Sequence, residues 1–228
     1  KKQIEWVSSQ NLIYDLITGG GFPKERLTEI CAWEGLGKTS LLMKSHAAVQ
    51  KEGKNSIFVD FEGTFNAQYA ESIYGLKVDQ DTFILLQPEN AEQGIELLDD
   101  MLNQAEENKV PVEMVSIDSI AACKPQSLID LAVDENGRIA IHAKTIALLV
   151  DKLRIRAKRQ GFAVVLINQF RGNPASSNSY SGPNNALWAG GVNETAYCPG
   201  GNAPRYYASI RMKMEYGGQV KPSAKNLN

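Results

Sequence analysis

Short apolar runs alternate with amphipathic stretches along this sequence, and this alternation restricts the possible folds more than any other feature. The apolar runs predict strands over Arg26–Trp33, Asn55–Glu62, Thr82–Pro88, Val112–Ile120, Phe162–Phe170 and Arg205–Met214. The amphipathic stretches predict helices over Thr39–Lys51, Ala67–Gly75, Ala91–Asn108 and Ile139–Gln160. Strands that alternate with helices form βαβ units. We therefore expect an α/β fold, with a mostly parallel, twisted β-sheet and helices on both faces.

The composition fits one folded unit over residues 1–228, with 43% apolar residues available for a core. The net charge of −2 is slightly repulsive to nucleic acid, so any such contact must come from a local patch. No apolar run has the length of a membrane helix, and no signal peptide is visible, so we expect no membrane association. Cys31, Cys123 and Cys198 are far apart and lack metal-type spacing, which favours reduced thiols and a cytoplasmic location.

A candidate phosphate loop, AWEGLGKTS, lies between the first of these strands and the helix that follows it. It matches the pattern G-x-x-x-x-G-K-[ST] except that Ala32 replaces the first Gly, which is tolerable if the φ angle of Ala32 is negative. In such loops backbone N–H groups bind phosphate oxygens, Lys38 reaches the β- and γ-phosphates, and the Thr39 hydroxyl binds Mg²⁺. We expect ATP contacts from Glu34, Gly35, Leu36, Gly37, Lys38, Thr39 and Ser40. The alternative is a chance Gly-Lys-Thr at the start of a helix.

Two predicted strands end in acids, and the carboxyl ends of parallel strands meet at one edge of a sheet. Glu62 follows one strand and could polarise the water that attacks a γ-phosphate. Asp118 ends another and could support Mg²⁺ beside Thr39. A helix-capping or surface role is the alternative for each acid.

The strand over Phe162–Phe170 ends near the amide side chain of Gln169, which could detect a γ-phosphate through a hydrogen bond. Directly afterwards, Arg171–Gly201 is rich in Gly, Asn, Ser and Pro, and a loop of this length is usually functional or disordered. This arrangement suggests a switch, in which the nucleotide state is read at Gln169 and passed to the loop. An ordinary polar strand end is the alternative.

At these motifs the sequence resembles the RecA recombinase family. The similar segments are LIYDLITGGGFPKERLTEI, AWEGLGKTS, FVDFEGTFNAQYA, SIDSIAACKP, LINQFR and GGNAPRYYASIRM. The resemblance implies a RecA-like P-loop ATPase core, without the family's N-terminal arm and C-terminal domain. It also implies that Glu62, Lys38 and Gln169 act in catalysis, that Thr39 and Asp118 hold the metal, and that Asn66 and Tyr69 contact adenine. Lys225 would reach the γ-phosphate bound by a neighbouring protomer.

The resemblance also implies two DNA-binding loops, near Leu128–Arg138 and over Arg171–Gly201. The residues expected to contact DNA are Lys144, Arg171, Gly200, Gly201 and Asn202. Independently, the predicted helix over Ile139–Gln160 is rich in basic residues: Lys144, Lys152, Arg154, Arg156, Lys158 and Arg159. Such residues can neutralise DNA phosphates, although a solvated helix face is an equal alternative.

We therefore expect a DNA-dependent ATPase that forms a filament on single-stranded DNA and promotes pairing and strand exchange with double-stranded DNA. The expected setting is the cytoplasm of a bacterial or phage-infected cell. One alternative is a ring helicase or a repair accessory ATPase of the same fold. Another is a nucleotide-binding regulatory module with weak hydrolysis.

Overall fold

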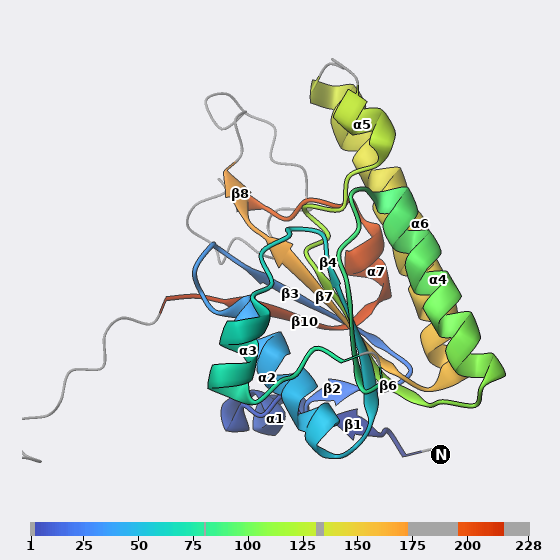
Figure 1. Ribbon diagram of the computed structural model, residues 1–228. Coiled ribbons are helices and arrows are strands. Elements are labelled where there is room, and N and C mark those ends of the chain that lie inside the picture. The colour runs from blue at the N-terminus through green and yellow to red at the C-terminus, as the bar shows by residue number, and fades with distance from the viewer. Residues whose placement is uncertain (1–2, 80, 131–134, 173–195, 217–228) are drawn as a thin grey trace, which may run out of the picture.

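The computed structural model describes residues 3–79, 81–130, 135–172 and 196–216 (Figure 1). Its central sheet has six parallel strands in the order β10-β3-β7-β6-β4-β5. The strands are β3 (Leu27–Ala32), β4 (Asn55–Asp60), β5 (Phe83–Leu86), β6 (Val112–Asp118), β7 (Ala163–Gln169) and β10 (Ala208–Met214). The expected α/β fold with a parallel sheet is confirmed.

Helices cover both faces of this sheet (Figure 1). On one side lie α1 (Leu12–Thr18), α2 (Lys38–Lys51) and α3 (Ala67–Tyr74), and on the other α4 (Ala91–Glu107), α6 (Glu135–Gln160) and α7 (Ala203–Tyr207). Successive residues of β4 point to opposite faces: Ile57 and Val59 pack in one apolar cluster, and Phe58 packs in the other. Because both faces are buried, the strand reads as a continuous apolar run.

Two short antiparallel ladders lie outside the main sheet. One pairs β1 (Trp6–Val7) with β2 (Phe22–Pro23) near the N-terminal end. The other pairs β8 (Arg171–Gly172) with β9 (Ala196–Tyr197). The second ladder brings together the start and the later part of the long polar segment, whose residues 173–195 lie outside the described chain.

Two expectations about local structure were wrong in part. The expected strand over Arg205–Met214 begins only at Ala208, because Ala203–Tyr207 forms helix α7 with a proline in its first turn, where the missing N–H is not needed. The expected first DNA loop is partly helical, since α5 spans Gln126–Asp130 and α6 already begins at Glu135. None of the helices in the described parts of the chain is both long and apolar enough to span a membrane.

His46 of α2 is a titratable group without contact to solvent. Its Nε2 lies 2.7 Å from Ser116 Oγ, and its ring packs against Phe58 and Phe83. Its Nδ1 has no hydrogen-bond partner within the described residues. Burial lowers the pKa of His46 to about 3, so the imidazole is neutral in the folded protein and serves packing.

This buried imidazole predicts a pH-dependent loss of stability. The unfolded chain protonates His46 below its usual pKa of 6.5, whereas the folded chain resists protonation down to about 3. The free energy of unfolding should therefore fall as the pH drops through this window, by about 1.4 kcal/mol per pH unit for this group. Chemical denaturation between pH 6 and pH 4 should give a shallower slope for His46→Gln. Phe58→Leu, which loosens the same cluster without removing the imidazole, should keep the wild-type slope; equal slopes in all three proteins would contradict the assignment.

Candidate nucleotide and DNA site

The candidate phosphate loop joins the carboxyl end of β3 to α2. Gly35 and Gly37 have φ angles of 74° and 84°, a left-handed conformation that glycine adopts without strain. Gly37 is the N-cap of α2 and offers no side chain to the first N–H groups of the helix. A helix N-terminus without a side-chain acceptor is a ready site for an anion.

Ala32 fits this loop because it is still part of strand β3. It pairs in register with Gln169 of β7, and it is not among the residues with a positive φ angle. The condition on which the sequence argument depended is therefore met. The next residue, Trp33, is 48% exposed and packs on the ring of Phe170 at 5.8 Å.

Lys38 is nearly buried, with 6% of its surface exposed. Its Nζ donates to the carbonyl oxygens of Trp33 at 2.9 Å and Ala32 at 3.4 Å. Burial lowers the pKa of this ammonium group, and the charges of Asp118 and Glu62 oppose the shift. Among the described residues the hydrogen-bond acceptors of this buried ammonium group are neutral carbonyls, which favours the arrival of an anion.

Thr39 and Asp118 meet as the motifs predicted. Thr39 Oγ1 donates to Asp118 Oδ2 at 2.6 Å, and Asp118 is only 2% exposed at the end of β6. Burial is the main cause that raises the pKa of Asp118 to about 6; the Thr39 hydrogen bond opposes the shift, and the charges of Glu62 and Asp60 add to it. A hydroxyl and a buried carboxylate surrounded by other acids fit a hard cation such as Mg²⁺.

Glu62 lies directly after β4 and is held from two sides. Its Oε1 accepts hydrogen bonds from Ser119 Oγ and from Gln169 Nε2. The sequence motifs named Glu62 and Gln169 separately, and the structure brings them into contact. The sequence motifs did not predict that Ser119 holds Glu62. The position of Ser119 directly after Asp118, at the same strand end, could have indicated this.

Asp60 shapes the loop that carries Glu62. Its carboxylate accepts backbone N–H bonds from Glu62, Gly63 and Phe65, at 2.9 to 3.0 Å. Gln87 Nε2 donates to the same carboxylate at 3.1 Å. Asp60, the last residue of β4, is therefore a positioning residue.

A cavity of about 450 Å³ opens beside these groups at the carboxyl edge of the sheet. Its polar lining residues include Glu34, Glu62, Ser119, Lys124, Gln169 and Arg171. The size suits a small-molecule ligand, and the lining combines a positioned acid with two exposed cations. The expected DNA residue Arg171 thus lies at the same cavity as the expected catalytic acid.

The two expected adenine contacts are not among the residues lining this cavity. Asn66 is the N-cap of α3, and its side chain accepts the backbone N–H of Tyr69. Tyr69 is 46% exposed, and its ring lies 6.0 Å from that of Tyr74. Their role toward adenine stays a prediction.

Four of the expected DNA-binding residues lie close together. Gly200 and Gly201 have φ angles of 101° and 71° and pack against Ile146 and Ala143 of α6, the helix that carries the exposed Lys144. Asn202 follows them as the exposed N-cap of α7. Lys225 lies outside the described residues, so its expected contact with a neighbouring protomer stays a prediction.

The close approach of Gly201 to α6 predicts a stability cost for a single methyl group. A Cβ at Gly201 would lie 2.9 Å from Ala143 Cβ, whereas a Cβ at Gly53, with nearly the same φ angle of 68°, would meet nothing within 4 Å. Gly53→Ala should therefore report the backbone strain alone, roughly 1–2 kcal/mol. Gly201→Ala should lower the free energy of unfolding by about 1–3 kcal/mol more. Equal losses in urea denaturation would show that α6 does not hold this segment.

Most of the basic residues on α6 have acidic partners. The ion pairs join Lys152 to Asp99, Arg154 to Asp151, Arg156 to Asp99 and Glu106, and Arg159 to Glu106. Three of these four basic residues fasten α6 to α4, a role that differs both from the expected phosphate contact and from a solvated helix face. Lys144 is exposed and makes no ion pair with the described residues, which keeps it available for a phosphate.

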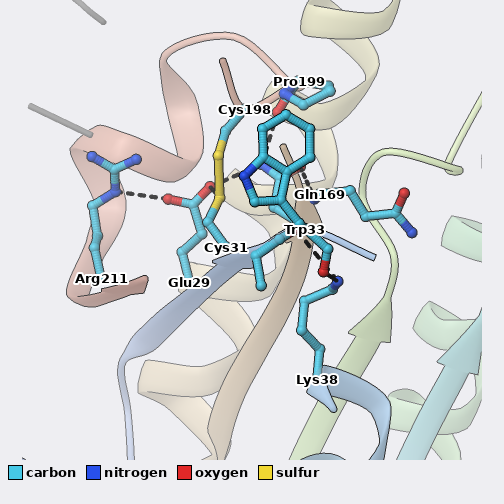
Figure 2. Close-up of a disulfide and its surroundings, with 10 residues drawn as sticks. Glu29, Cys31, Trp33, Lys38, Gln169, Cys198, Pro199 and Arg211 are labelled. Atoms are coloured by element: carbon cyan, nitrogen blue, oxygen red, sulfur yellow. Dashed lines mark hydrogen bonds and ion pairs between the residues drawn. A yellow bond between two sulfur atoms is a disulfide. The ribbon is translucent and has the colours of Figure 1, made fainter. Parts of the chain in front are cut away.

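The cysteines correct the expectation of reduced thiols. A disulfide joins Cys31 of β3 to Cys198 (Figure 2), and only Cys123 is free within the described residues. The two partners are 167 positions apart in sequence, but strand order brings them together because β7, which leads into the long segment, lies next to β3. Spacing along the chain carries no information about such a contact.

A buried ion pair lies beside this disulfide (Figure 2). The side chain of Glu29 is 2% exposed and pairs with Arg211 Nε of β10 at 2.7 Å. Asn168 Nδ2 donates to Glu29 Oε1 at 3.0 Å and to the carbonyl oxygen of Pro199 at 2.9 Å. These contacts link β10, β3 and β7 to the segment that precedes Gly200, and sequence reasoning did not anticipate them.

Comparison with known proteins gives the family of this chain. The profile of the RecA N-terminal domain matches residues 1–228. Protein RecA of Acinetobacter baumannii is 31% identical over 219 residues, which cover 96% of this chain and 56% of the relative. Protein RecA of Nostoc punctiforme is 31% identical over 97% of this chain and 58% of its own length. Protein RecA of Francisella tularensis subsp. novicida is 30% identical, with 96% and 55% covered. The chain thus spans a little over half the length of the curated relatives it matches, and it belongs to the RecA family.

Proposed function

We propose that this chain is the core of an ATP-dependent DNA recombinase that forms a filament on single-stranded DNA and promotes homologous pairing and strand exchange. The observation that carries the proposal is the double contact at the end of β7. Gln169 bonds to Glu62 in the cavity, and its neighbour Asn168 bonds to the Pro199 carbonyl. One strand end therefore contacts both the acid proposed to act on ATP and the segment proposed to contact DNA.

ATP is the nucleotide that the phosphate loop and Lys38 would bind. Lys38 would exchange the carbonyls of Trp33 and Ala32 for phosphate oxygens, a stronger partner for an ammonium group. Thr39 and Asp118 would hold Mg²⁺, which when bound neutralises negative charge on the phosphate oxygens. The buried carboxylate of Asp118 supports this, because it lacks a cationic hydrogen-bond partner among the described residues.

Glu62 is proposed to orient the attacking water and accept its proton while ATP is cleaved to ADP and phosphate. In the structure Gln169 donates to Glu62. A γ-phosphate offers the amide of Gln169 a second acceptor, so the bond to Glu62 can be exchanged. A shift of Gln169 displaces Asn168, which is bonded to the loop end, and the nucleotide state thereby biases the DNA-contacting segment.

DNA would be held by Lys144, Arg171, Gly200, Gly201 and Asn202, through contacts with its backbone. Sequence recognition would then come from base pairing between strands. We expect binding that depends strongly on salt and little on sequence. Self-association into a filament, with Lys225 near the neighbour's nucleotide, a single ATPase core over residues 1–228 and a cytoplasmic location belong to the same proposal.

The proposal predicts that single-stranded DNA stimulates ATP turnover. Lys38→Ala should lower turnover by at least about 100-fold, with and without DNA, because a phosphate-binding cation is lost. The matched control is Lys44→Ala, which removes an exposed lysine from the same helix and should leave turnover unchanged. Stimulated turnover makes strand exchange the next assay. A rate of ATP turnover that does not change with DNA would instead favour an accessory ATPase. Unwinding of duplex DNA in one direction would favour a helicase.

A further inference from the structure

The disulfide Cys31–Cys198 connects a rigid part of the protein to the end of the proposed DNA loop (Figure 2). Cys31 is completely buried in β3, which is hydrogen-bonded on both sides, to β10 and to β7. Cys198 is partly exposed and follows the short ladder of β8 and β9. Strand β3 is therefore the fixed end of the cross-link. The disulfide limits the position of Cys198 and of the segment that follows it.

The segment after Cys198 contains three of the five residues proposed to contact DNA: Gly200, Gly201 and Asn202. Pro199 accepts the hydrogen bond from Asn168, and Gly200 and Gly201 pack on α6. In the disulfide form a covalent bond to β3 and the Asn168 hydrogen bond both attach this segment to the sheet. In the dithiol form the covalent bond is lost, and the Asn168 hydrogen bond, next to the nucleotide-reading Gln169, remains.

We propose that Cys31 and Cys198 are a reversible dithiol–disulfide pair that controls the coupling between DNA binding and ATP hydrolysis. This regulation rests on the proposed function. The closed pair holds the loop end on β3 whatever the nucleotide state, so DNA no longer changes the rate of hydrolysis. The open pair leaves the loop end under the control of Asn168 and Gln169.

A small disulfide such as oxidised glutathione supplies the oxidant. The Cys198 thiolate, which solvent can reach, attacks one glutathione sulfur and releases the first glutathione as a thiolate. The Cys31 sulfur then attacks the Cys198 sulfur of the mixed disulfide and releases the second. Two cysteine thiols are oxidised, one glutathione disulfide is reduced to two thiols, and the two cysteine protons end on these thiols. A small dithiol such as dithiothreitol reverses the exchange.

Cys123 provides an internal reference. It is buried and has no disulfide partner, and burial raises the pKa of its thiol to about 12. It therefore contributes almost no thiolate near neutral pH and should not react in the folded protein. After denaturation, alkylation should modify all three cysteines of the reduced protein but only Cys123 of the oxidised protein.

The test treats the wild-type chain with oxidised glutathione or with dithiothreitol, removes the reagent, and measures thiol number by mass spectrometry. ATP turnover is then measured with and without single-stranded DNA. Oxidation should close the pair, leave DNA-independent turnover unchanged, and lower the DNA stimulation by roughly 5- to 150-fold, a typical size for coupling between sites. Cys198→Ser should show full stimulation under both conditions, and Cys123→Ala should behave as wild type.

Three results would overturn the proposal. The first is three free thiols after oxidation, and the second is unchanged DNA stimulation in a protein whose Cys31–Cys198 disulfide has formed. The third is a reduced protein whose Cys31 and Cys198 resist alkylation until a chelator removes bound Zn²⁺. The last would make the pair a metal site with Glu29, whose carboxylate lies within 4.8 Å of both sulfur atoms. If the reduced protein hydrolyses ATP but never responds to DNA, the proposed function fails, and the regulation fails with it. Thiol number still decides in that case whether the pair itself is reversible.

Discussion

Glu62→Gln is expected to lower ATP turnover by roughly 10²- to 10⁴-fold, the usual contribution of a general base. The amide has the same shape as the carboxylate, and its oxygen can still accept from Ser119 and Gln169, as Glu62 Oε1 does. It has no basicity to take a proton from water. The affinity for ATP should therefore stay close to that of the wild type, which separates a chemical effect from a lost site. Steady-state turnover and the binding of a fluorescent ATP analogue measure the two quantities.

Two further variants test how specific this effect is. Glu34→Gln removes another, exposed acid from the same cavity. Glu34 is expected to contact ATP as part of the phosphate loop, where backbone N–H groups bind the phosphates, so this side-chain change should leave turnover within a few fold of wild type. Ser119→Ala deletes a hydroxyl that holds Glu62 but keeps the base. Its turnover should therefore lie between those of Glu34→Gln and Glu62→Gln. If Glu34→Gln and Glu62→Gln lower turnover equally, the cavity needs negative charge in general, and the assignment of a single base is wrong.

The contacts at the carboxyl edge of the sheet were predictable from the sequence for a simple geometric reason. Parallel strands end at the same edge, so residues that close different apolar runs must meet there. Thr39 and Asp118, which were expected at one metal site, are hydrogen-bonded to each other, and Glu62 touches Gln169. The apolar periodicity therefore predicts the fold and the meeting of Asp118, Glu62 and Gln169, and the phosphate-loop motif adds Thr39.

The contacts on the β10 side were not predictable, because they depend on strand order. The pattern of apolar runs does not predict that β10 lies beside β3. This pairing brings Arg211 to Glu29. The same limit applies to Cys31 and Cys198, which are distant in sequence and lack a spacing motif. Helix α7 was missed for a local reason, since the aromatic residues Tyr206 and Tyr207 favour a strand by composition, whereas Pro204 starts a helix turn.

The Glu29–Arg211 pair predicts a large loss of stability on removal of one partner. Glu29 is buried and Arg211 is mostly covered, with side chains 2% and 20% exposed. Arg211→Ala leaves a buried carboxylate with Asn168 as a neutral donor, and breaking such a pair costs about 3–5 kcal/mol of unfolding free energy. For a chain of this size each kcal/mol lowers the melting temperature by roughly 2–4 °C, so we expect a fall of about 6–20 °C. Calorimetry in dithiothreitol measures it without a contribution from the neighbouring disulfide.

A double-mutant cycle distinguishes the cost of leaving the Glu29 carboxylate buried without its partner from the cost of lost packing around Arg211. In a Glu29→Gln background no buried charge remains, and Arg211→Ala should cost at least about 1 kcal/mol less than it does in the wild type. Lys54→Ala, which breaks an exposed pair with Glu52, should change stability by less than about 1 kcal/mol. If Arg211→Ala costs the same with and without the Glu29 carboxylate, the stability comes from the arginine stem packed between the sheet and its surroundings, and the ion pair contributes nothing of its own.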